Sequence, residues 1–150
     1  MKDYLDQLKS ELKRAEHLFY VSLKYTRTVD VIRSVIERIL NAFDAGIEAL
    51  LIKTKKRRKN LKIPEQPRKK CELVKEVYEK DEKLVNFIDF YLELRDILQA
   101  KYDSKEEYRR HVTMISTIEP GKTIGVNIDL LQEYYEKAKQ FEEYITELIG

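Results

Sequence analysis

Apolar residues recur at every third or fourth position along most of the chain, which is the spacing of one face of an α-helix. The spacing predicts a first helix over residues 3–25. Its apolar stripe consists of Leu5, Leu8, Leu12, Ala15, Phe19 and Leu23.

The second predicted helix carries the widest apolar face of the chain. Thr28 is of a residue type that caps helix starts, and Asp30 follows in the first turn, where the helix dipole favours an acid. The helical pattern continues to about residue 59. So wide a face predicts a central core helix or a helix that meets a second subunit. Gly46 lowers helix stability by about 1 kcal/mol relative to Ala, so its presence predicts a close approach of another helix.

Two prolines, Pro64 and Pro67, interrupt the pattern and predict a connector before a third helix. The third helix is predicted over residues 67–100, with a bend or an interruption at the polar run YEKDEK. A final helix is predicted from Asn127 or Asp129 to the C-terminus.

The apolar period changes between the third and the last helix. The stretch YDSKEEYRR predicts a short helix, because Ser104 and Glu107 have the Ser-x-x-Glu spacing of a capping box. The stretches HVTMISTI and TIGVNI are rich in Val, Ile and Thr, and Pro120-Gly121 between them suits a type II turn. These features predict a β-hairpin over about residues 112–126, which lies on the bundle or pairs across a dimer.

The predicted fold class is mainly all-α. We expect a single domain over residues 1–150, built as a bundle of four long helices with a short extra helix and a β-hairpin before the last one. Composition agrees, because Gly (4) and Pro (3) are scarce and charged residues make up 37% of the chain, against about 25% ordinarily. Heavy use of Lys and Glu is also typical of proteins that work at high temperature.

The single cysteine, Cys71, indicates a reducing compartment. No stretch has the uninterrupted apolar length of a signal peptide or of a membrane span. We therefore expect a cytoplasmic protein with no membrane segment.

Positive charge is concentrated between Lys53 and Lys70. That segment holds ten Lys or Arg and one Glu, a balance of +9, whereas the whole chain carries only +2. Such a segment predicts contacts with the phosphates of RNA or DNA. It contains no aromatic residue, so base stacking and sequence-specific recognition are not expected. The alternative is a solvated helix end, since cations in a last turn complement the helix dipole. The predicted phosphate contacts are Lys55, Lys56, Arg57, Arg58, Lys59, Lys62, Arg68, Lys69 and Lys70.

Motifs for catalysis are missing from the sequence. It has no G-x-S-x-G elbow, no glycine-rich phosphate loop, and no H-E-x-x-H or Glu-x-x-His pair, so neither a metal nor another cofactor is predicted. His17 lies beside Glu16 in the first predicted helix and is expected to be a partly exposed helix histidine rather than a functional one. His111 follows Arg109 and Arg110, and this group could bind phosphate through forked guanidinium donors and an imidazole. The alternative is that both arginines pair with nearby glutamates or with a neighbouring helix.

The segment AEHLFYVSLKYTRTVDVIRSVIERILNAFDAGIEALL, residues 15–51, resembles the first two helices of HEPN-type domains. The resemblance implies an all-α bundle that forms a homodimer and accompanies a nucleotidyltransferase partner protein. Many such domains are ribonucleases that use Arg-x(4–6)-His near the start of a late helix. The positions that would hold the arginine before His111 are Glu106, Lys105 and Ser104, so the motif is not present there. It is not present before His17 either.

Three functions are therefore open. The first is a non-catalytic, dimeric binding protein that contacts RNA or DNA phosphates without sequence specificity through residues 53–70. The second is a purely structural module for oligomerisation or partner docking. The third is a divergent HEPN-type ribonuclease with His111, Arg109 and Arg110 at a dimer cleft. The missing motif favours a protein that is not an enzyme.

Overall fold

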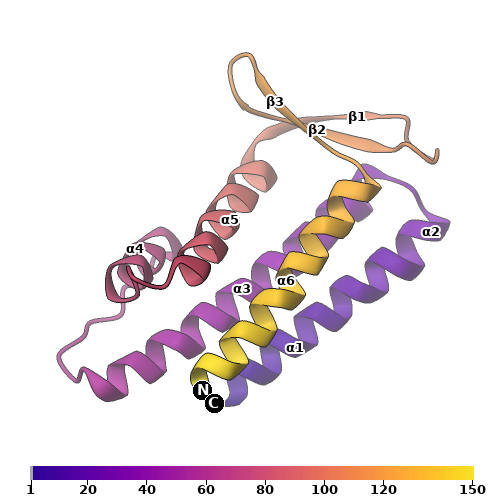
Figure 1. The fold of residues 1–150 in the computed structure, drawn as a ribbon. Coiled ribbons are helices and arrows are strands. Elements are labelled where there is room, and N and C mark those ends of the chain that lie inside the picture. Colours follow the sequence, from indigo (N-terminus) through magenta and orange to yellow (C-terminus); the bar gives the residue numbers. More distant parts are fainter. Residues whose placement is uncertain (1) are drawn as a thin grey trace.

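Three long helical segments lie side by side in the computed structural model, which describes residues 2–150 (Figure 1). The first is α1 (Lys2–His17), which continues through a π-helical segment, η1 (Leu18–Ser22), into α2 (Leu23–Tyr25). It packs along α3 (Val29–Arg57), and α6 (Ile128–Ile149) packs against both. In Figure 1, α1 runs antiparallel to α3 and α6, so the two chain termini lie close together.

Helix α3 is the central core helix. It begins where predicted, because Thr28 Oγ1 accepts a hydrogen bond from the N–H of Val31. Its last residue is Arg57, slightly before the predicted end. Of the two predicted roles for its wide apolar face, the core role is confirmed, because its apolar side chains are buried within this chain. No helix within residues 2–150 has the length and apolar character that crossing a bilayer requires.

The predicted third helix is divided into α4 (Pro67–Val77) and α5 (Glu82–Gln99), which lie beside α3 in Figure 1. The interruption falls in the polar run, as predicted, and the Asp81 side chain caps α5 by accepting a backbone hydrogen bond at 3.1 Å. The end of α4 is held to α3 by Tyr78, whose hydroxyl lies 2.8 Å from Thr54 Oγ1. The chain is therefore mostly helical, but one of the four predicted long helices is two shorter ones.

A three-stranded antiparallel sheet closes one end of the helices (Figure 1). Its order is β1 (Lys101–Lys105), β2 (Thr113–Glu119) and β3 (Lys122–Val126). The predicted hairpin is confirmed as β2 and β3, and Gly121 has a φ of 79°, as the second central position of a type II turn requires.

The short helix predicted after Ala100 is wrong. Residues 101–105 form β1, which pairs in register with β2 from Lys101 opposite Thr117 to Lys105 opposite Thr113. The capping-box spacing of Ser104 favours a helix start, whereas pairing with β2 gives residues 101–105 a complete ladder of inter-strand hydrogen bonds. The strand forms because β2 offers this segment an edge to pair with.

The sheet lies on the helices, which is the first of its two predicted alternatives. Met114 and Val126 are buried, and Ser116 Oγ donates a hydrogen bond of 3.0 Å to the Ile97 carbonyl. The loop after β1 is anchored as well, because the N–H of Tyr108 donates to the Arg27 carbonyl at 2.6 Å.

Aromatic rings from α3, α5 and α6 meet in the core. Phe43 and Phe141 stack with their centroids 4.0 Å apart, and Tyr91 stacks 5.8 Å from Phe43. A Cβ on Gly46 would lie 2.6 Å from Phe141 Cε2, so the close helix approach predicted at this glycine is confirmed. On α4, Cys71 is fully buried, and burial raises the pKa of its thiol to about 11.

Candidate phosphate-binding surfaces

The end of α3 extends past the end of α6. Lys53 Nζ donates to the Leu148 carbonyl at 3.4 Å and also to the Ile149 carbonyl, in the last turn of α6. Beyond Lys53, α3 continues for about one more turn to Arg57. Figure 1 shows this end at the lower left, beyond both chain termini. The connector 58–66 then leads from it to α4.

Three cations of the 53–70 segment form contacts with other parts of the chain. Lys53 caps α6, as described. Arg68 Nη2 pairs with Asp96, and Lys70 Nζ lies 2.7 Å from Glu48 Oε2 in a pair whose side chains are 23% and 21% exposed. Arg68 and Lys70 are among the phosphate contacts predicted from the sequence, whereas in the structure each of them pairs with a carboxylate of this chain.

The other predicted contacts are exposed and form no ion pair within residues 2–150. Lys69 is one of them, in the first turn of α4. The remaining six form what we call the basic tip: Lys55, Lys56, Arg57, Arg58, Lys59 and Lys62. The tip offers cations to a polyanion but contains neither an aromatic ring nor a histidine. Its chemistry is therefore electrostatic contact.

The predicted group Arg109, Arg110 and His111 lies in the loop between β1 and β2, at the sheet end of the molecule and away from the basic tip (Figure 1). All three residues are exposed. Within residues 2–150 their side chains form no hydrogen bond and no ion pair, so the predicted pairing with nearby glutamates is not observed. In the part of the chain that the structure describes, no side-chain hydrogen bond or ion pair orients the imidazole or the two guanidiniums.

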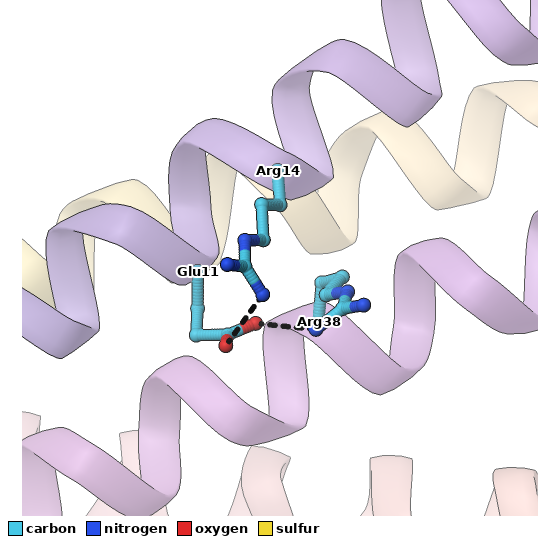
Figure 2. A network of polar contacts seen from close by, with 3 residues as sticks. All are labelled: Glu11, Arg14 and Arg38. Atoms are coloured by element: carbon cyan, nitrogen blue, oxygen red, sulfur yellow. Dashed lines mark hydrogen bonds and ion pairs between the residues drawn. The ribbon is translucent and has the colours of Figure 1, made fainter.

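Sequence reasoning missed a group that joins α1 to α3. Glu11 on α1 is only 8% exposed, and its carboxylate lies between two arginines (Figure 2). Arg38 Nη1 on α3 donates to Glu11 Oε2 at 3.2 Å, while Arg14 Nη1 on α1 lies 3.7 Å from Oε1. One carboxylate thus draws together two guanidiniums from two helices.

The sequence held a partial signal for this group. Four polar residues of α1 recur at the spacing i, i+3, i+4 and i+7, which places them on one helical face beside the apolar stripe. They are Ser10, Lys13, Arg14 and His17. His17, for which partial exposure was predicted, is exposed and lies on this same face of α1. The contribution of Arg38 could not be read from spacing, because it comes from another helix.

Comparisons of the chain with protein-family models, with curated proteins and with solved structures find no match.

Proposed function

We propose that this protein binds the phosphate backbone of RNA or DNA through its basic tip, without reading the base sequence. The observation that carries the proposal is a projecting helix end and the start of the connector after it, which together carry six exposed cations with no internal carboxylate partner among the described residues. Cations that pair with Asp or Glu inside the fold have less to offer a ligand, so the unpaired ones define the surface.

The physical basis is counterion release. Each phosphate neutralised by Lys or Arg frees condensed counterions, so affinity falls steeply as salt rises. Base stacking requires aromatic side chains, and the tip from Lys55 to Lys62 has none. The exposed rings of Tyr25 and Tyr108 lie instead at the end of α2 and in the loop after β1, which is anchored to Arg27.

Fluorescence anisotropy with labelled single-stranded RNA, single-stranded DNA and duplex DNA tests the proposal between about 50 and about 200 mM salt. The triple variant Arg57→Ala, Arg58→Ala and Lys59→Ala removes half of the tip. Each lost contact to a single strand lowers the slope of log affinity against log salt by about 0.7, so the slope should fall by about 2.

A matched control removes three exposed cations from elsewhere: Lys24→Ala, Lys101→Ala and Lys139→Ala. Net charge changes equally in both variants, so a purely global charge effect would weaken them alike. The proposal fails if the wild-type chain binds none of the three probes at low salt. It also fails if the control variant loses as much of the salt slope as the tip variant.

The proposed assembly follows from the HEPN-like pattern of residues 15–51. These residues cover the end of α1, all of η1 and α2, and most of α3. We propose a HEPN-like homodimer that accompanies a nucleotidyltransferase partner. Sedimentation equilibrium of the full chain tests the homodimer, and a monomer at every concentration tested would contradict it.

The ribonuclease alternative gains no support from His111, which is exposed and has no side-chain partner among the described residues.

A further inference from the structure

An open depression of about 430 Å³ lies between α1 and α3, beside the arginines that Glu11 holds. We call it the basic pocket. Three cations, one imidazole, one hydroxyl and one apolar side chain line it, and no carboxylate of the described residues does. The lining residues are Ser10, Lys13, Arg14, His17, Leu18 and Arg38.

The pocket keeps many hydrogen-bond donors free. A guanidinium has several N–H groups, and Arg14 and Arg38 each direct a single nitrogen at Glu11. Within residues 2–150, no side-chain hydrogen bond or ion pair engages Ser10, Lys13 or His17. Donors from two helices therefore converge on one depression, and Glu11 restrains the two largest of them.

We propose that the basic pocket binds the phosphate monoester group of an organic ligand, a site separate from the basic tip. Planar guanidiniums match the oxygens of a phosphate in forked pairs, and Lys13 adds a point charge to balance a dianion. The depression has the volume of a small-molecule site. Leu18 and the methylene stems of Lys13 and Arg14 offer apolar surface to the organic part.

Glu11 has a positioning role in this site. Its carboxylate offsets part of the repulsion between Arg14 and Arg38, and it fixes both near the α1–α3 seam before a ligand arrives. Side chains that are already ordered lose less conformational entropy on binding. The competing explanation is that the three residues only fasten α1 to α3 and that the depression binds nothing.

The test is an NMR titration of the full-length chain labelled with ¹⁵N, using adenosine 5′-monophosphate, inorganic phosphate and adenosine as probes. The monophosphate should shift amide signals of α1 around residues 10–18 and of α3 around Arg38, and it should bind more tightly than either fragment. Adenosine or inorganic phosphate binding as tightly as the monophosphate would overturn the assignment of a monoester. Shifts confined to the tip would overturn the site.

Variants separate this site from the tip. Arg38→Gln should weaken the monophosphate about tenfold, the loss expected for one charge-assisted hydrogen bond. Lys13→Ala should weaken it as well, and since the Lys13 side chain is exposed and has no ion pair among the described residues, we expect this variant to fold. The control Arg110→Gln and the tip triple variant should bind it normally. Equal weakening by Arg110→Gln, or none by Arg38→Gln and Lys13→Ala, would refute the proposal.

Two oligonucleotides distinguish the sources of such a phosphate. If the ligand is the end of a nucleic acid, a 5′-phosphorylated strand should displace the monophosphate from the pocket of the tip triple variant, and the 5′-hydroxyl strand should not. If neither strand displaces it, the ligand is a small phosphorylated metabolite. Because the tip variant is used, failure of polymer binding at the tip leaves this result unaffected.

Discussion

The basic tip and the basic pocket present similar charges but are built in opposite ways. The tip consists of neighbours in the sequence, from Lys55 to Lys62, that project into solvent and hold no internal partner among the described residues. The pocket consists of residues from two helices that a nearly buried Glu11 draws together. One surface depends on charge density alone, whereas the other depends on the packing of α1 against α3.

This difference has a functional consequence. A cluster of exposed surface cations suits a long polyanion, for which the number of phosphates matters more than their placement. Restrained guanidiniums at a depression suit one compact anion with fixed geometry. The two surfaces should therefore respond differently when the packing of the helices is disturbed.

Phe141→Ala is the change with the largest expected effect. The ring stacks on Phe43 and fills the space that Gly46 leaves, so truncation should lower the free energy of unfolding by about 3–5 kcal/mol. Urea denaturation followed by circular dichroism measures it. Monophosphate binding should disappear as the chain unfolds, while polymer binding, which needs only the charges, should persist in the unfolding range.

Tyr25→Ala is the control, since Tyr25 is 79% exposed and its removal should leave the unfolding free energy within about 0.5 kcal/mol of wild type. Monophosphate binding that survives unfolding would abolish the contrast between the two surfaces. So would polymer binding that is lost at the same urea concentration as the helical signal.

The sequence predicted the parts of the fold that local chemistry decides. Thr28 caps α3, Pro67 begins α4, Gly121 forms the turn, and Gly46 marks a close contact, because each residue type has its own backbone or steric signature. The strand β1 was mistaken for a helix because its partner, β2, lies later in the chain and supplies hydrogen bonds that Ser104 cannot reveal.

The same limit applies to the two surfaces. A run of cations can be read directly from a sequence, so the sequence predicts the tip. It does not show which of those cations have carboxylate partners. Arg68 and Lys70 meet carboxylates of other helices, and Arg38 meets Glu11 across 27 residues of chain. Contacts of this kind depend on how the helices pack. The apolar stripe of a helix shows which face is buried, but it does not show which residues of the neighbouring helix lie opposite.

Glu11→Gln tests whether the pocket arginines are held by a charge. The change leaves Arg14 and Arg38 without their carboxylate, and both are partly solvated, so we expect a loss of about 1 kcal/mol of unfolding free energy rather than the larger cost of a fully buried pair. Urea denaturation at low and high salt measures it, and salt should reduce the difference between the two proteins.

The tip triple variant is the counterpart of this change. Its three side chains touch no carboxylate within residues 2–150, so its unfolding free energy should match wild type within about 0.5 kcal/mol. If the tip variant proved as destabilised as Glu11→Gln, the tip cations would have a structural role that contradicts the distinction.

The smallest expected effect separates two adjacent lysines at the boundary of the basic segment. Lys70 pairs with Glu48, whereas its neighbour Lys69 is exposed and unpaired in the described chain. Lys70→Gln should therefore cost about 0.5–1 kcal/mol, and Lys69→Gln should cost nothing measurable but weaken polymer binding slightly. The buried thiol of Cys71, next to Lys70, reports the difference because it reacts only when α4 opens.

Thiol labelling at constant pH measures how often α4 opens. The raised pKa of Cys71, about 11, keeps the folded thiol neutral at pH 8, whereas an unfolded thiol ionises near about 8.5. Burial of the neutral Cys71 thiol stabilises the folded chain at pH values below the pKa of the unfolded thiol. This stabilisation is lost as the pH rises toward the pKa of the folded thiol, so labelling should accelerate in alkaline buffer in every variant.

At pH 8, Lys70→Gln should label about two to five times faster than wild type, as its lost free energy implies, and Lys69→Gln should label at the wild-type rate. Equal labelling of the two variants would mean that the pairing of Lys70 contributes nothing, and the whole segment from 53 to 70 would then behave as one solvated run of charge.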